Sequence, residues 1–160
     1  MTVASMALVN GDHGLSEEAR TLREALRSPS ATPAGASFDR RLWELQEAVD
    51  EASLPNWDGY GATPVTREAF EAAIAFSQAL PTTWPSPEIA ADPDGEITFE
   101  WSRGPQMVFA VSFGGGDLVS YAGLFGRSKT RGTEILVDPV PKVVMDNLVR
   151  LFPNKLRLSA

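Results

Sequence analysis

The sequence of 160 residues contains no cysteine and a single histidine, His13. The absence of cysteine excludes disulfide scaffolds, thiol nucleophiles, iron–sulfur clusters and cysteine-ligated zinc sites. One histidine argues against a Ser-His-Asp triad, an HExxH zinc site and any centre with several histidine ligands. We therefore expect no cofactor and no metal, and any catalysis would depend on carboxylate, tyrosine, lysine or arginine side chains.

The sequence also lacks a run of the roughly 18 to 20 apolar residues that spans a bilayer, and its start lacks the basic and then apolar pattern of a secretory signal. We expect a cytoplasmic protein. Basic residues are few, 14 against 21 acidic ones, for a formal net charge of −7. Nucleic acid and membrane are therefore unlikely partners. The charge is uneven, however: residues 37–120 carry 14 acidic and 4 basic side chains, and residues 121–160 carry 3 and 7.

Residues 1–36 are predicted to form an N-terminal extension, and residues 37–160 a single domain. The segment 28–37 (SPSATPAGAS) has the small, polar composition of a flexible linker. Before it, Ser16 is a candidate N-cap for a short helix. The narrow apolar stripe of that helix consists of Leu15, Ala19, Leu22 and Leu26. A helix this short is marginal alone, so we expect it to fray or to dock on another surface.

Helical periodicity is clear from residue 38 onward. The apolar positions that recur at helical spacing are Phe38, Leu42, Leu45, Val49 and Ala52. This helix is expected to end near Leu54, because a residue before proline is pushed out of the α region. A second helix is predicted to start with Thr63 as N-cap and Pro64 at the first helical position, and to end at Pro81.

The apolar period changes from 3.6 to 2 after residue 88. The alternation predicts strands at 88–91, 97–101, 107–113 and 117–124, then a loop at 126–132 and a final strand at 133–137. Short turns between strands make neighbours antiparallel. A closing helix is expected to carry Val144, Leu148 and Leu151. The predicted class is α+β, with two N-terminal helices, an antiparallel meander of four to five strands, and a C-terminal helix packed on one sheet face.

Several short motifs occur in a fixed order along the chain. They are NWDGYGA at 56–62, a helix ending in LP at 80–81, DGEI at 94–97, EW at 100–101, YAG at 121–123 and GTE at 132–134. This combination resembles an uncharacterised family of small bacterial proteins with an N-W-D-G-x-G-A signature. The resemblance covers about residues 54–137. It implies a single bacterial domain and no particular reaction.

The NWDGYGA segment holds the first candidate binding residues, Trp57, Asp58 and Tyr60. Its two glycines permit close backbone approach, its aromatic rings are able to stack on a ligand, and Asp58 is suited to act as a base, a metal ligand or a hydrogen-bond anchor. The structural alternative is that Asp58 caps the turn while Trp57 and Tyr60 fill the gap between the two helices and the sheet.

The segment 126–132 holds the second candidate set, Arg127, Lys129 and Arg131, in a glycine-flanked loop. The functional interpretation is a clamp for an anion or for an acidic protein partner. The alternative is a mobile hairpin loop whose cations balance the acidic body. A P-loop is not expected, because the glycine that must precede the lysine is replaced by Ser128.

A catalytic alternative combines three residues from different segments. Glu100 is expected on the strand face opposite Ile97 and Phe99, either paired with Glu96 or in an ordinary solvated sheet face. If Glu100 met Asp58 and Tyr121 in a cleft, the three would suit a small hydrolase or transferase. Because no nucleophile–base pair or cofactor fingerprint is present, we favour a non-enzymatic binding or regulatory module whose partner is a protein with an acidic patch.

Overall fold

The computed structural model describes the backbone of residues 33–154 and the side chains from residue 40 onward. The helix predicted around residues 15–26 and the first part of the predicted linker lie outside the described residues. Along the described chain the elements follow in the order α2 (Pro33–Glu51), α3 (Arg67–Ala79), β1 (Glu88–Ala91), β2 (Ile97–Ser102), β3 (Met107–Phe113), β4 (Leu118–Phe125), β5 (Ser128–Ile135) and α4 (Lys142–Leu151).

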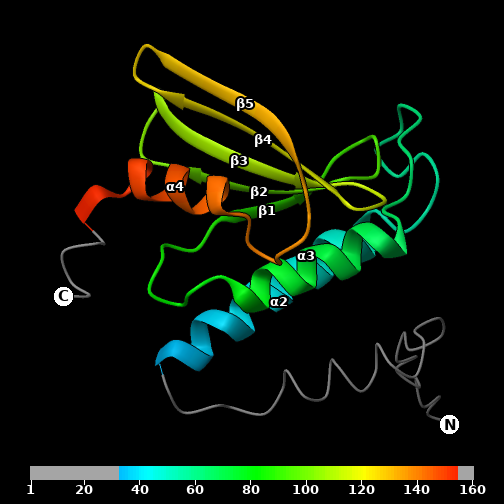
Figure 1. The fold of residues 1–160 in the computed structure, drawn as a ribbon. Helices are drawn as coiled ribbons and strands as arrows, with labels where there is room; N and C mark the ends of the chain where they lie inside the picture. The colour runs from blue at the N-terminus through cyan, green and yellow to red at the C-terminus, as the bar shows by residue number, and fades with distance from the viewer. Residues whose placement is uncertain (1–32, 155–160) are drawn as a thin grey trace, which may run out of the picture. The chain divides into compact units, whose positions relative to one another are not determined.

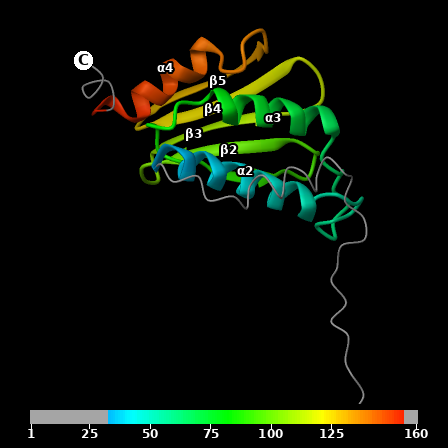
Figure 2. The ribbon, with the colours of Figure 1, turned by 90° about the horizontal axis from the view of Figure 1, so that it is seen from below.

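The five strands form one antiparallel sheet in the order β1-β2-β3-β4-β5. Helices α2, α3 and α4 all lie on the same face of this sheet (Figures 1 and 2). The predicted α+β class, with an antiparallel meander and a C-terminal helix on one sheet face, is confirmed. None of the described helices is long and apolar enough to cross a membrane.

The start of helix α2 differs from the prediction. The helix begins at Pro33, before the predicted start at Phe38. Proline is favoured at a first helical position because its φ angle is preset and its missing N–H has no partner there. The small residues that follow do not stop a helix, although their composition resembles a linker. The expected boundary between residues 36 and 37 therefore falls inside α2.

Helix α3, in contrast, starts later than predicted. Its N-cap is Thr66, whose Oγ1 accepts a hydrogen bond from the Ala69 N–H at 3.1 Å. Thr63 is not the cap, because its N–H donates to the Pro93 carbonyl at 2.8 Å and holds the backbone outside the helix. The predicted end before Pro81 is confirmed, since the helix closes at Ala79.

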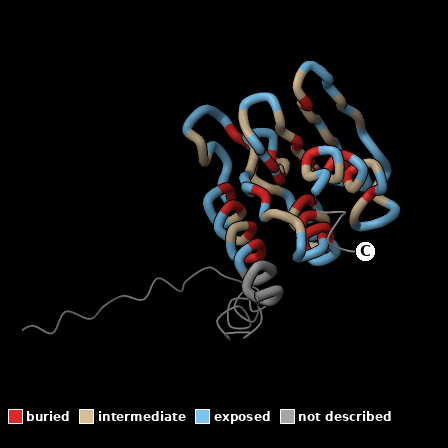
Figure 3. Tube along the Cα trace, turned by 90° about the vertical axis from the view of Figure 1, so that its left-hand side faces the viewer, coloured by how far each residue is buried: buried red, intermediate tan, exposed pale blue. Residues whose placement is uncertain are grey.

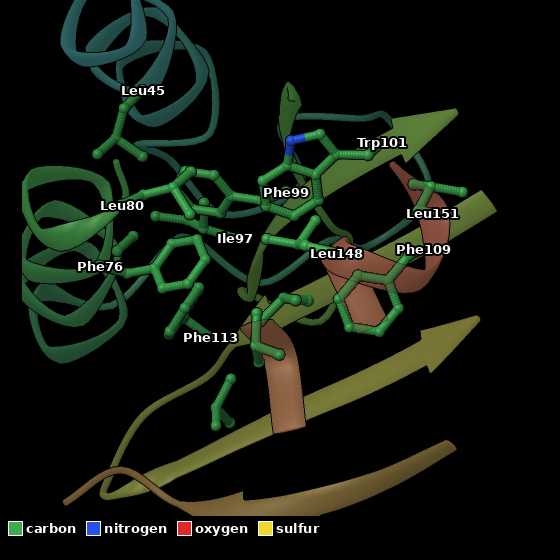
Figure 4. Close-up of a cluster of buried hydrophobic side chains, with 14 of the residues drawn as sticks. Leu45, Phe76, Leu80, Ile97, Phe99, Trp101, Phe109, Phe113, Leu148 and Leu151 are labelled. Atoms are coloured by element: carbon green, nitrogen blue, oxygen red, sulfur yellow. The ribbon is translucent and has the colours of Figure 1, made fainter. Parts of the chain in front are cut away.

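The core lies between the helices and the inner face of the sheet, and Phe76 points from α3 toward the side chains of the sheet (Figure 4). The ring of Phe76 lies 5.1 Å from that of Phe99 and 4.9 Å from that of Phe113. Edge-on and tilted contacts of this kind add to the hydrophobic gain from burial. Buried residues follow the helices and the central strands, whereas the connecting turns are exposed (Figure 3). Helix α4 completes the core with Val144, Leu148 and Leu151, as predicted.

Candidate functional site

The NWDGYGA loop is held together by its own polar groups. Asn56 adopts a φ of 62°, and its Oδ1 accepts from the Gly61 N–H at 2.7 Å while its own N–H donates to the Ala62 carbonyl at 2.7 Å. Asp58 Oδ1 accepts from the N–H groups of Tyr60 at 2.7 Å and Ala62 at 3.1 Å. The predicted capping role of Asp58 is confirmed, and this carboxylate oxygen is already engaged in closing the loop.

The two aromatic residues of the loop have different environments. Trp57 is half-buried; its Nε1 donates to the Thr63 carbonyl at 3.2 Å, and its ring lines a cavity of about 400 Å³ beside α2 and β1. Tyr60 is 95% exposed, so the prediction that it fills the gap between helices and sheet is wrong. The backbone wraps around the Asp58 carboxylate, and this wrapping leaves Tyr60 at the tip of the loop.

The predicted basic loop at 126–132 is largely a strand. Strand β5 already pairs with β4 at Ser128, opposite Phe125, so only Gly126 and Arg127 form the turn. Gly126 has a φ of 64°, the left-handed conformation that a tight hairpin requires. The prediction of a loop followed by a strand at 133–137 is therefore wrong. Lys129 and Arg131 are strand residues, so the side of the sheet from which their side chains project is fixed.

The three residues of the catalytic alternative do not come together. Glu100 and Tyr121 lie on opposite faces of the sheet, since Glu100 aligns across the strands with Ala110 and Ala122, and Tyr121 aligns with Val111 on the inner face. Asp58 belongs to the loop between α2 and α3. A shared acid–base site requires hydrogen-bond reach between its groups, and a sheet separates two of these three.

The outer face of the sheet is the side that no described helix covers (Figure 1). The strand registers place its residues in rows that cross all five strands. The central row, from β1 to β5, is Glu88, Glu100, Ala110, Ala122 and Arg131. The next row toward the start of β2 is Ala90, Thr98, Ser112, Ser120 and Thr133. In the central row, small side chains thus occupy the middle of the face and long charged ones occupy its two margins, whereas the neighbouring row is made of short side chains throughout.

A shallow groove of about 570 Å³ follows this face. Its floor is formed by small and aliphatic residues of β3 and β4, and its walls are Glu100 on one side and Lys129 and Arg131 on the other. A second apolar feature lies at the far end of the same face, where Leu118 and Ile135 pair across β4 and β5 and are 53% and 66% exposed. The groove combines an apolar floor with opposite charges on its two walls.

The charges of the outer face have no partners among the described residues. Glu88, Glu100, Lys129 and Arg131 are exposed and form no ion pair with any residue that the structure describes. Glu88 and Glu100 are directly opposite on neighbouring strands, a like-charge arrangement that is unfavourable in an isolated sheet. Four inter-strand steps separate Glu88 from Arg131, roughly 19 Å, so the two margins do not neutralise each other within one chain.

Glu96 belongs to a different group of carboxylates. Burial raises the pKa of Glu96, and the neighbouring Asp94 and Asp92 raise the same pKa further. Glu96 precedes β2, and its N–H donates to Asp94 Oδ1 at 3.3 Å. It lies in the β1–β2 turn region, four residues before Glu100 and so roughly 13 Å from it along the extended chain, which is too far for the suggested pairing. Over the described residues, no three histidine or carboxylate groups are arranged to hold a metal ion.

No protein-family model, curated protein or solved structure matches this chain. The sequence indicates Lys129 and Arg131 in one candidate set and Glu100 in another, but it does not point to Glu88, Ala110 and Ala122. These residues share one face because of the registers of the four strand pairings. The last of these, between β4 and β5, follows from the tight turn at Gly126.

Proposed function

We propose that this chain is a non-enzymatic binding module of the bacterial cytoplasm that contacts a protein partner through the outer face of its sheet. The observation that carries the proposal is the groove on that face, with an apolar floor and unpaired charges on both walls. A face that only contacts water usually carries long polar side chains. Here Ala110 and Ala122 occupy the centre, and they permit another backbone or side chain to approach closely.

The chemistry of the partner follows from the walls. Lys129 and Arg131 project from the same side of β5, so they suit a partner with an acidic patch. Even an exposed ion pair contributes only about 0 to 1 kcal/mol to the free energy of folding. Two neighbouring cations that lack a partner are therefore not explained by a contribution to stability. The hydrolase or transferase alternative lacks comparable support, because Asp58, Glu100 and Tyr121 are apart.

A photo-crosslinking amino acid at position 122 tests this proposal in cells of the native host. Position 78 is the matched control, because Gln78 is exposed but lies on α3, on the other side of the sheet. We expect one discrete protein adduct from position 122 and none from position 78. The adduct should disappear when Lys129→Glu and Arg131→Glu are introduced together. Equal labelling from both positions, or an adduct that survives both reversals, would remove the outer face as the binding surface.

A further inference from the structure

We infer that the partner of the outer face is a second copy of this chain, packed face to face about a two-fold axis parallel to the strands. This inference rests on the proposed function and specifies its partner. Its basis is the central row of the face, which reads Glu, Glu, Ala, Ala, Arg from β1 to β5. A closed dimer requires a surface that complements itself. The central row does this, because its acidic end and its basic end are exchanged when the copy is turned over.

The two-fold geometry can be followed strand by strand. When a sheet is turned onto a copy of itself about an axis along its strands, β1 of one copy lies over β5 of the other, and β3 lies over β3. Glu88 then faces Arg131 of the second copy, and Glu100 lies over Ala122 of the second copy, next to the same arginine. Each long acidic side chain meets a cation or a short residue, and the contact occurs twice.

The rows on either side also match under this operation. In the row that contains Thr98, Ser112 and Ser120, Ser112 meets Ser112 of the second copy and Thr98 meets Ser120 of the second copy. On the other side of the central row, the residues of β2 to β5 are Ser102, Val108, Leu124 and Lys129, and Val108 meets Val108 of the second copy. Sheets that pack face to face keep their strands within about 30° of each other, as this arrangement requires. No pair in the three rows brings like charges together.

The size of the face limits the strength of the dimer. Five strands about 4.8 Å apart, each roughly 20 Å long, present on the order of 500 Å² per copy. This is near the lower limit of about 1,000 Å² in total for a specific interface. We therefore expect a reversible dimer with a dissociation constant in the micromolar range rather than an obligate one.

An edge-to-edge dimer through β5 is the competing arrangement, since β5 is an edge strand. In that arrangement the two-fold axis is perpendicular to the sheet, so the outer face of each copy remains outer. Lys129 and Arg131 would then lie near the same cations of the second copy. The charges oppose this arrangement and favour the face-to-face one.

Reciprocal charge reversal, read by sedimentation velocity, distinguishes these arrangements. One variant carries Glu88→Arg and Glu100→Arg, and the other carries Lys129→Glu and Arg131→Glu. In the face-to-face dimer each variant opposes like charges to like, whereas an equimolar mixture restores opposite charges at both contacts. We expect the wild type to dimerise with increasing concentration, each variant to weaken the dimer at least tenfold, and the mixture to recover it. Melting temperatures of both variants verify folding.

Glu134→Arg is the matched control, because Glu134 is exposed on the same strand but projects from the inner side. This reversal should leave the face-to-face dimer unchanged. A wild type that stays monomeric at millimolar concentration, variants that dimerise like wild type, or a mixture that stays monomeric would overturn the inference. If the adduct from position 122 contains a different protein, the second copy is rejected while the proposed function stands. Absence of any adduct rejects the function itself.

Discussion

The ring of Tyr121 lies directly over Gly132, its cross-strand neighbour on the inner face of β4 and β5. A Cβ at Gly132 would overlap the outer end of the Tyr121 ring, so a side chain at position 132 requires this ring to move. We expect Gly132→Ala to destabilise the fold by about 1 to 3 kcal/mol, the usual cost of overpacking. Urea denaturation measures this cost.

The double variant isolates that contact. In a Tyr121→Ala background the ring is absent, so adding Gly132→Ala should cost much less than it does in the wild type. Ser128→Ala is the control on the same side of β5. An equal cost of Gly132→Ala in both backgrounds would show that the ring is not what excludes a side chain at position 132.

The left-handed conformation of Asn56 leads to a second prediction. Asn56→Ala loses the bond from Gly61 and places an alanine at a φ of 62°, so we expect a loss of about 2 kcal/mol. Asn56→Gly should cost less, because glycine adopts this conformation freely. Tyr60→Ala should leave stability unchanged, since Tyr60 is exposed. If thermal melts rank the alanine and glycine variants of Asn56 equally, backbone conformation is not the cause.

Arg41 is an unusual member of the interior. It is 1% exposed, its Nη2 donates to the Leu80 carbonyl at 3.2 Å, and its Nε has no partner among the described atoms. Burial lowers the pKa of this guanidinium. We expect Arg41→Met, which keeps the apolar volume, to change stability by less than about 1 kcal/mol. Arg41→Ala should cost about 2 to 4 kcal/mol because it leaves a cavity. Chemical denaturation that finds both variants equally unstable would mean that the charge itself is required.

Glu96 gives a prediction about pH. Its pKa is raised in the folded state, so the folded chain binds this proton more tightly than the unfolded chain does. Ionised Glu96 therefore destabilises the fold at neutral pH, and this penalty vanishes as the pH falls below the ordinary value of 4.5. Glu96→Gln should melt at a higher temperature than wild type at pH 7 and at the same temperature near pH 3.5. A difference that persists unchanged at low pH would rule out ionisation as the cause.

The basic residues of β5 and its turn should matter for binding and not for folding. We expect Arg127→Ser, Lys129→Ser and Arg131→Ser together to keep the melting temperature within a few degrees, since exposed charges contribute little to stability. The yield of the adduct from position 122 should fall at least tenfold, which corresponds to a loss of about 1.4 kcal/mol of binding free energy. In the wild type, the same adduct should weaken as salt screens the charges. An undiminished adduct would leave these cations with only a charge-balancing role.

The sequence predicts the strands that lie under a helix better than the strand that no helix covers. Strands 88–91 and 107–113 have the predicted ends, because residues such as Phe109 and Val111 alternate with smaller ones when one face is buried. The sequence predicts a loop over residues 128–132, which form most of strand β5. No helix covers this strand, and its two sides carry Lys129 and Arg131 against Thr130 and Gly132, so the segment lacks an apolar period of two. The groove was missed for a related reason, since it combines residues of β2 to β5 through register alone.

A binding role of the outer face can be measured as the rate at which a single thiol reacts on that face. Because the chain has no cysteine, Ala122→Cys and Gln78→Cys each introduce one unique thiol. Both positions are exposed, one on the outer sheet face and one on α3. We expect position 122 to react at least tenfold more slowly in native cells than in dilute purified protein, with no such change at position 78. Equal reactivity of position 122 in cells and in dilute solution would contradict a binding role for this face.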